Sequence, residues 1–315
     1  MFKNNMIEVH KKIQSIIGNV VEIKPIGNHD LKRHLVFLVE TFEKSYVIKF
    51  YYVKNRWNRE VAALKLLEDT DILVPHLVDY GKLDEVEWIL YEYVNGALLD
   101  TIQEEIPTSN LKDIYFKAGE QLGLLHSLKY FEHYGILNED LEFKNSYHTF
   151  KSYFQNEVER IFTNLNKFTH EEIDLINKAK KTLMKTLEFL NDNDIQARLC
   201  HNDFGARNLI VSKDSGAYKL VCVIDFEHSV IADADRELVL FYYSLKDSNE
   251  PLWKAFERGY EGHLAINQDS IHDKKLLYRL YRGLSICSWS QNVDKDHYDE
   301  GIKILKETLI SYSER

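Results

Sequence analysis

The first ninety residues or so alternate short apolar or aromatic runs with polar turns, which is the pattern of β-strands. Five such runs are present, at 20–26, 34–40, 45–52, 77–80 and 86–94. Between the third and fourth runs, residues 55–67 place Val61, Leu64 and Leu67 at helical spacing. This part of the chain therefore predicts a small mixed sheet that carries one helix.

After Gly96 the pattern changes to long amphipathic segments with charged outer faces, which predict helices. They lie at 110–128, 147–165 and 171–190 and, beyond Asp235, at 276–289 and 301–311. In between, apolar runs at 209–211 and 219–224 flank the turn-forming Asp214-Ser215-Gly216. These two runs predict a β-hairpin.

Strands and helices thus fall in separate stretches of the chain, which defines the fold class as α+β. We expect a sheet-rich N-terminal domain at residues 1–93 and a larger, mainly helical domain at residues 94–315. With 44% hydrophobic and 29% charged residues, the composition is that of an ordinary globular chain, and the length is ample for a core.

The chain carries 40 Lys and Arg residues against 50 Asp and Glu residues, a net charge of −10. This balance argues against a nucleic-acid partner, because duplex binding needs clustered positive charge. It tilts the expected small-molecule partner toward a cation. No run of about 18 uncharged apolar residues is present, so no membrane span or membrane partner is predicted.

The three cysteines, Cys200, Cys222 and Cys287, lie far apart and form no CxxC pair. This spacing argues against a disulfide framework and a structural zinc site, and favours buried free thiols in a reducing compartment. The N-terminal sequence lacks the apolar core and cleavage site of a signal peptide. We therefore expect a cytoplasmic protein.

The segment richest in chemistry runs from 198 to 226. It contains His201-Asn-Asp-Phe-Gly-Ala-Arg-Asn208 and then, after the hairpin, Val223-Ile-Asp-Phe226, which Glu227 follows directly. Asp203 and Asn208 lie on one polar loop, and Asp225 ends a nearby strand. Such oxygen ligands suit Mg²⁺, and a separate carboxylate on the loop would orient an attacking hydroxyl and accept its proton.

The ordered pair HxDxxxxN and (I/V)DF resembles the catalytic and metal loops of the protein-kinase-like superfamily. Within it, HND and IDFE resemble choline kinases, and DFGxxN resembles hygromycin-type aminoglycoside phosphotransferases. The resemblance implies that Asp203 is the catalytic aspartate and that Asn208 and Asp225 bind Mg²⁺. It makes His201 a structural member of the loop.

Earlier segments fit the same family in the same order. Lys49, in Tyr-Val-Ile-Lys, matches the lysine that contacts the α- and β-phosphates, and Glu60 on the following helix matches its ion-pair partner. Residues 91–96 resemble the hinge, where backbone groups of Glu92 and Val94 would bind adenine. The resemblance thus implies a bilobal kinase-like fold, with a nucleotide-binding N-terminal lobe and a catalytic, substrate-binding C-terminal lobe.

Three positions depart from the protein-kinase pattern. The nucleotide loop, Ile26 to Leu31, has the single glycine Gly27, so its phosphates would need other donors as well. Glu227 replaces the glycine of the DFG motif, as in small-molecule kinases, either as a metal or substrate contact or as a structural cap. Arg207, beside the metal asparagine, would form a structural salt bridge or reach a phosphate.

The resemblance implies an ATP-dependent, or alternatively GTP-dependent, phosphotransferase that uses Mg²⁺ and phosphorylates a hydroxyl of a small molecule. An aminoglycoside-like compound or an amino alcohol is the expected acceptor; the oligomeric state is unknown from sequence. Two alternatives remain: a non-catalytic kinase-like nucleotide-binding protein, and a metallohydrolase that uses His201, Asp203, Asp225 and His228.

Overall fold

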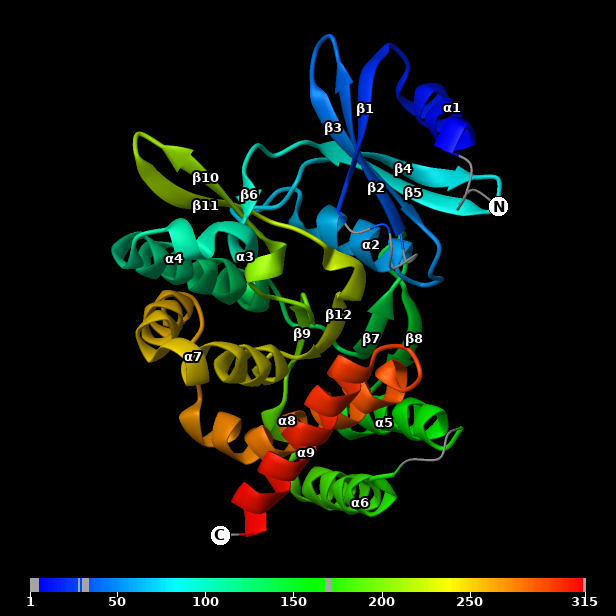
Figure 1. Ribbon diagram of the computed structural model, residues 1–315. Coiled ribbons are helices and arrows are strands. Elements are labelled where there is room, and N and C mark those ends of the chain that lie inside the picture. Colours follow the sequence, from blue (N-terminus) through cyan, green and yellow to red (C-terminus); the bar gives the residue numbers. More distant parts are fainter. Residues whose placement is uncertain (1–5, 28, 30–33, 168–170, 314–315) are drawn as a thin grey trace. The chain divides into compact units, whose positions relative to one another are not determined.

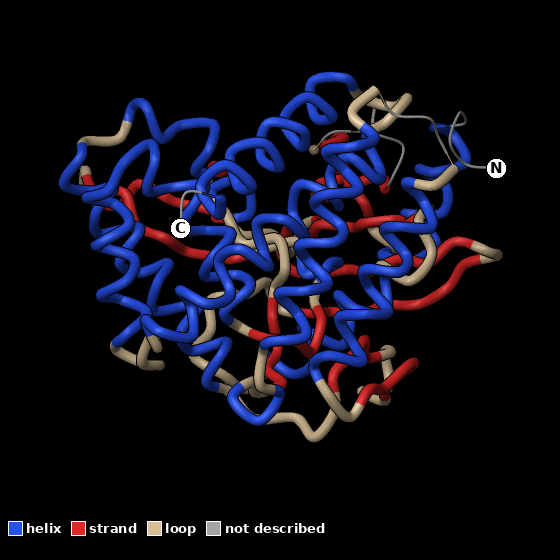
Figure 2. Tube along the Cα trace, turned by 90° about the horizontal axis from the view of Figure 1, so that it is seen from below, coloured by secondary structure: helices blue, strands red, loops and turns tan. Residues whose placement is uncertain are grey.

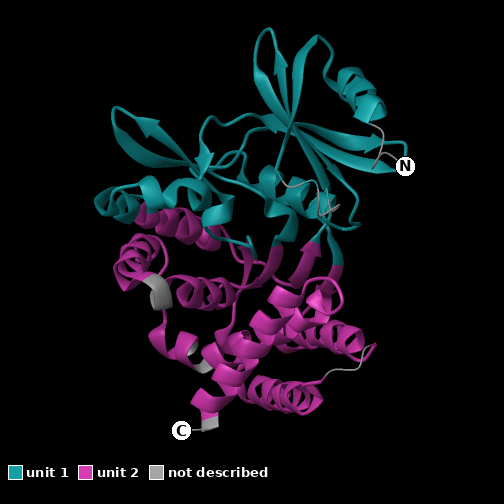
Figure 3. Cartoon of the chain, viewed as in Figure 1, with its two compact units in different colours: residues 1–114, 137–144, 201–229 teal, residues 115–136, 145–200, 230–315 magenta. Residues whose placement is uncertain are grey.

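The computed structural model describes residues 6–27, 29, 34–167 and 171–313 (Figure 1). It confirms the α+β class, since the early part of the chain is mostly strand and the later part mostly helix. Figure 2 shows the helices and the strands in separate colours. The chain forms two compact units (Figure 3). Unit 1 comprises Met1–Ile114, Leu137–Lys144 and His201–Ser229, and unit 2 comprises Tyr115–Ile136, Asn145–Cys200 and Val230–Arg315.

Unit 1 contains a five-stranded sheet in the order β1-β2-β3-β5-β4. Its strands are β1 (Val20–Ile26), β2 (His34–Thr41), β3 (Ser45–Tyr51), β4 (Leu77–Leu83) and β5 (Val86–Glu92). Every pairing is antiparallel, so the expectation of a mixed sheet is wrong. Short connections allow only antiparallel neighbours, and the one long connection leads to the edge strand β4, from which β5 returns beside β3.

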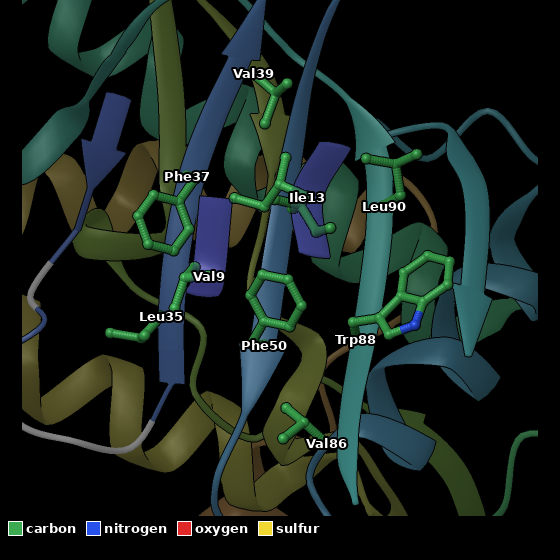
Figure 4. Packing of buried hydrophobic residues seen from close by; sticks show 10 residues of the cluster. Val9, Ile13, Leu35, Phe37, Val39, Phe50, Val86, Trp88 and Leu90 are labelled. Atoms are coloured by element: carbon green, nitrogen blue, oxygen red, sulfur yellow. The ribbon is translucent and has the colours of Figure 1, made fainter. Parts of the chain in front are cut away.

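A helix that the sequence pattern did not predict, α1 (Met6–Ile17), covers one face of this sheet. Val9 and Ile13 of α1 are buried and pack on the sheet (Figure 4). Their partners on β2, β3 and β5 are Leu35, Phe37, Val39, Ile48, Phe50, Val86, Trp88 and Leu90. The N-terminal part therefore carries two helices instead of one, because an apolar stripe this short was masked by the strand pattern that follows it.

The predicted helix, α2 (Trp57–Leu67), also packs on the sheet, where it contacts β4 and β5. The Trp57 indole donates a hydrogen bond to the Trp88 carbonyl over 2.8 Å. Side chains alternate along a strand, so Lys49 points away from the face on which Ile48 and Phe50 pack. Lys49 is thus directed toward the side of the sheet that carries α2.

The predicted hairpin is confirmed as β10 (Leu209–Asp214) and β11 (Ala217–Val223), which pair antiparallel. Its turn residues Ser215 and Gly216 both have positive φ angles, of 50° and 91°. Such angles are typical of a tight hairpin turn. The short strand β6 (Ala97–Leu98) pairs with the other side of β10.

The later part of the chain is mainly helical, as predicted. Its helices are α3 (Leu99–Ile102), α4 (Thr108–Ser127), α5 (Phe150–Leu165), α6 (Ile173–Phe189), α7 (Asp235–Glu261), α8 (Gln268–Ser290) and α9 (Lys295–Ser313). Four short strands were not predicted: β7 (Tyr134–Leu137), β8 (Phe143–Tyr147), β9 (Ala197–Cys200) and β12 (Val230–Asp233). Runs of four or five residues are too short to show a period.

Within unit 2, helices α4 and α7 approach each other closely at two glycines. A Cβ atom at Gly119 would lie 2.0 Å from the Phe256 carbonyl oxygen, and one at Gly259 would lie 2.0 Å from that of Phe116. Only glycine fits at such a crossing. The three cysteines are buried and free, as the sequence predicts. Within the described residues, no helix has the length and apolar character to cross a membrane.

Candidate functional site

The centre of the candidate site is the buried side chain of Lys49, which is only 3% exposed. Its Nζ atom lies 2.7 Å from Asp225 Oδ1, 2.9 Å from Glu60 Oε2 and 2.9 Å from Glu227 Oε2. One lysine from β3 therefore meets a carboxylate from α2 and two from the segment after β11. All four residues belong to unit 1.

In this cluster, burial and the neighbouring charges shift the pKa values in opposite directions. Burial disfavours a charged lysine, but Asp225 and Glu60 outweigh it and raise the pKa of Lys49 well above its ordinary value. Burial also opposes ionisation of Asp225, yet Lys49 holds the pKa of that carboxyl below its ordinary value. At Glu60, burial exceeds the attraction of Lys49 and the pKa is raised. The cluster thus holds more negative charge than one lysine neutralises.

Glu60 is positioned by two elements. Helix α2 places it against Lys49, and the Tyr51 hydroxyl on β3 donates a hydrogen bond to its Oε2 atom. Lys49 and Tyr51 are two residues apart on one strand and so project from the same face. The periodicity of β3 therefore brings both donors to one carboxylate.

Glu227 is held by groups that sequence reasoning missed. Its Oε1 atom accepts from Arg56 at 2.6 Å, and its Oε2 atom lies 3.4 Å from His34 Nδ1. Burial opposes ionisation of Glu227, but Lys49, His34 and Arg56 outweigh it and lower its pKa. Burial and Arg56 lower the pKa of His228 to about 4, so this histidine is neutral at pH 7 and accepts from Arg56.

The loop that carries Asp203 is built around His201. The His201 Nε2 atom donates to the Ile224 carbonyl over 2.9 Å, and its Nδ1 atom accepts from the Asp203 amide over 3.2 Å. Because both ring nitrogens are engaged, His201 has a structural role and offers no lone pair to a metal. His201 is therefore not available as a ligand for the metallohydrolase alternative. Asn202, between them, has a positive φ of 64°.

The carboxylate of Asp203 is held by two residues of its own loop. Asn208 Nδ2 lies 3.2 Å from Asp203 Oδ2 and 2.8 Å from the Asp203 carbonyl oxygen. Arg207 forms an ion pair with Asp203 Oδ1. With its nitrogen so used, Asn208 has a side-chain oxygen without a hydrogen-bond partner in the described part of the chain.

Asp225 follows β11 with a left-handed backbone, at φ 68° and ψ 59°. Such a conformation is unusual for a residue other than glycine and is typical of functional loops. The amide of Ile224, the residue before it, donates to the backbone carbonyl of Asn208 over 2.9 Å. The two predicted metal ligands are therefore tied together through the backbone, and a carboxylate with an amide oxygen is a donor set that fits Mg²⁺.

Glu60, Asp225 and Glu227 offer oxygen atoms that all lie within 4.8 Å of one another, which is the geometry of a site able to hold a cation. The three carboxylates carry more negative charge than Lys49 and Arg56 neutralise, which also favours a bound cation. Glu227, for which the sequence left two roles open, thus lies beside Asp225 and caps Lys49 and Arg56.

The expected hinge, residues 91–96, begins in the last two residues of β5. The Glu92 amide donates to the His76 carbonyl over 3.0 Å, and its side chain pairs with Lys44 at 2.5 Å. The amide of Glu92 is therefore engaged, whereas that of Val94 makes no hydrogen bond within the described residues. No hydrogen bond or ion pair of the described residues joins either one to Lys49.

Gly27 turns the chain after β1 with a φ of 74°, which glycine adopts without strain. In the expected nucleotide loop, Ile26 is the last residue of β1. Residues 28, 30 and 31 of this loop lie outside the described residues. His29 Nε2 lies 2.9 Å from the Val36 carbonyl on β2. The structure thus brings Lys49, Glu60 and Asp225 into contact and ties them to the Asp203–Asn208 loop. Within the part of the chain that the structure describes, no hydrogen bond or ion pair joins Gly27, Glu92 or Val94 to this cluster.

The chain belongs to the phosphotransferase enzyme family, whose model matches residues 26–269. That stretch includes the lysine of β3, the expected hinge and both loops of the candidate site. No curated protein shows significant similarity in sequence. Membership of this family makes the protein a member of a class of phosphotransferase enzymes.

Solved structures share the fold at low sequence identity. Aminoglycoside phosphotransferase APH(4)-Ia is 15% identical, with a TM-score of 0.76 over 98% of this chain and 99% of that one. A variant of aminoglycoside 2'-phosphotransferase-IIIa with GDP is 18% identical, with a TM-score of 0.68 over 98% of both chains. Spectinomycin phosphotransferase APH(9)-Ia, in complex with ADP and spectinomycin, is 16% identical, with a TM-score of 0.64 over 95% of this chain and 93% of that one.

Proposed function

We propose that the protein transfers the γ-phosphoryl group of ATP, or of GTP, to a hydroxyl group of a small molecule. The observation that carries the proposal is the direct contact of Lys49 with Glu60 and Asp225, tied through Ile224 and Asn208 to the loop of Asp203. A cation donor set, a buried lysine and a separate carboxylate on one scaffold are the parts that phosphoryl transfer needs.

Each residue has a defined task in this proposal. Lys49, held by Glu60, neutralises the α- and β-phosphates. Asn208 and Asp225 hold Mg²⁺, which when bound supplies charge neutralisation at the phosphate oxygens. Asp203 orients the acceptor hydroxyl and takes its proton at a carboxylate oxygen. Catalysis is then mainly positioning and electrostatic stabilisation.

The nucleotide would lie against residues from the first part of the chain. The Glu92 carbonyl and the Val94 amide are the groups proposed to bind the base, and the turn at Gly27 is proposed to lie over the phosphates. Residues 1–93 are then the nucleotide-binding lobe, and residues 94–315 are the catalytic and acceptor-binding lobe.

The net charge of the chain and the ligands of similar structures support the proposed acceptor class. A net charge of −10 favours a cationic acceptor. Similar structures include a variant of APH(4)-Ia with ADP and hygromycin B. We therefore propose an aminoglycoside-like compound or an amino alcohol, phosphorylated in the cytoplasm, where the three buried free cysteines stay reduced.

The test is nucleotide consumption and product formation with hygromycin B, spectinomycin, choline and ethanolamine, for the wild type and for Asp203→Ala. We expect at least one phosphorylated product. The variant should lose turnover on the order of 10²–10⁴-fold, because its proton acceptor is gone, while nucleotide affinity by calorimetry stays the same. Near-normal turnover in Asp203→Ala contradicts the assignment. Nucleotide binding without any phosphorylated product favours the non-catalytic alternative.

A further inference from the structure

Both oxygens of the Asp203 carboxylate already have a donor from the protein. Asn208 holds Oδ2, and the same amide also bonds the Asp203 backbone, so this contact is fixed by the fold of the loop. Arg207 holds Oδ1, and its guanidinium makes no other hydrogen bond or ion pair in the described part of the chain. Arg207 therefore contacts only Oδ1 of Asp203, whereas Asn208 is held by two hydrogen bonds to Asp203.

The two donors also differ in their exposure to solvent. The side chain of Arg207 is 59% exposed and that of Asp203 is 22% exposed, whereas Asn208 is buried. Arg207 thus covers the solvent side of the carboxylate. An exposed ion pair between residues four positions apart is weak. Such a pair favours the covered state but yields to a competing donor that is held in place by other contacts.

We propose that Arg207 is a displaceable cap on Asp203 that disfavours attack by water until the acceptor hydroxyl takes its place. The inference rests on the proposed function and deepens it. During transfer, the acceptor O–H bond breaks and its proton goes to Asp203. A bond forms between the acceptor oxygen and the γ-phosphorus, and the bond from that phosphorus to the bridging oxygen breaks, which releases the nucleoside diphosphate.

Water at the same carboxylate would undergo the same step and waste the nucleotide as diphosphate and inorganic phosphate. A single water molecule has only its own hydrogen bonds with which to compete against a charged donor. An acceptor that is bound through its other groups presents its hydroxyl at a high effective concentration and displaces the guanidinium. The cap therefore discriminates between water and acceptor without a moving lid.

The cap and a purely positioning role predict opposite kinetics. If Arg207 merely aligns Asp203, its removal lowers kcat for transfer and leaves the KM of the acceptor unchanged. If Arg207 is a cap, its removal raises nucleotide hydrolysis in water alone. It also lowers the KM of the acceptor, because no competitor remains on Oδ1, and kcat changes little.

The experiment measures inorganic phosphate release without acceptor, and transfer to the panel member with the highest turnover, for the wild type, Arg207→Ala and Arg207→Lys. We expect Arg207→Ala to hydrolyse nucleotide about 2- to 5-fold faster, the range of a weak exposed pair, and to lower the acceptor KM by a similar factor. Arg207→Lys, which keeps a cation, should lie between the two.

Lys219→Ala is the matched control, because Lys219 is as exposed as Arg207 and also forms an ion pair, with Asp214 at the end of the hairpin. It should change neither rate. Unchanged or slower hydrolysis in Arg207→Ala, or a lower kcat at constant KM, overturns the cap. Failure of the proposed function looks different, because the wild type itself would then form no phosphorylated product, whereas failure of the cap alone leaves product formation by the wild type intact.

Discussion

At the scale of single residues, the site depends on one buried lysine that faces three carboxylates. Lys49 cannot neutralise Glu60, Asp225 and Glu227 together, and Arg56 compensates for only part of the excess. Removing a partner from a buried pair normally destabilises a protein. In this cluster the loss of one carboxylate charge should cost little stability. Lys49 still forms ion pairs with the other two carboxylates when the third is neutralised.

We therefore expect Glu60→Gln to leave the free energy of unfolding within about 1 kcal/mol of the wild type, since the Tyr51 hydroxyl still has an oxygen to bond and burial of a charge is relieved. Lys49 would then shift toward Asp225. Affinity for Mg²⁺-nucleotide should fall about 10-fold, the equivalent of about 1.4 kcal/mol. Denaturant unfolding and calorimetry measure the two quantities. A large loss of stability with full affinity would show that Glu60 serves the fold alone.

At the scale of elements, helix α2 is attached to the segment that follows Asp225. It packs against residues 226–228. Arg56, which precedes the helix, pairs with Glu227, and the Ser229 hydroxyl donates to the Arg59 carbonyl over 3.0 Å. These contacts fix the end of α2 from which Glu60 reaches Lys49. Arg56 is thus a positioning residue that acts on the lysine through the helix.

Arg56→Ala should raise the KM for nucleotide more than it lowers kcat, because α2 loses an anchor while Asp203 is untouched. A double-mutant cycle with Glu227→Gln should give a coupling of about 1–3 kcal/mol in nucleotide affinity. Lys54→Ala, an exposed change in the same connection, is the control and should have no effect. Additive effects of Arg56→Ala and Glu227→Gln would refute the link between the helix and this carboxylate.

The elements that could be predicted are those with a long or regular pattern. The run at 20–26 is β1, with the same bounds, and the Asp214-Ser215-Gly216 turn joins β10 to β11. Helix α1 was missed because its buried stripe is short, and the four-residue strands carry no period. At this scale, prediction from sequence succeeds where local pattern and final packing agree.

The same distinction applies to the site. Lys49, Asp203 and Asp225 lie in motifs whose order along the chain matches one family, so the sequence predicts that they belong to one site. Arg56 and His34 stand in no motif, and their partner Glu227 is remote in sequence: Arg56 and Glu227 are separated by 171 positions. Such pairs depend on tertiary structure, and the only local signal was the departure of Glu227 from the DFG pattern.

At the scale of the whole molecule, the site is assembled from distant stretches of chain within a single unit. Lys49 and Asp225 are 176 positions apart, and yet both belong to unit 1, which takes up His201–Ser229 from the later part of the sequence. The nucleotide and metal groups of the proposal therefore depend on one compact body. Unit 2 contains most of the later helices, and within it α4 and α7 pack closely at Gly119 and Gly259.

Lys49, Asn208 and Asp225 are proposed to form one Mg²⁺-dependent nucleotide site. Calorimetric titration of the wild type and of Asp225→Asn with a non-hydrolysable ATP analogue, with and without Mg²⁺, tests it most directly. The wild type should bind on the order of 10-fold or more tightly with Mg²⁺, and Asp225→Asn should lose that difference while staying folded. Equal affinity of the wild type with and without Mg²⁺, or an undiminished Mg²⁺ effect in Asp225→Asn, would contradict the account.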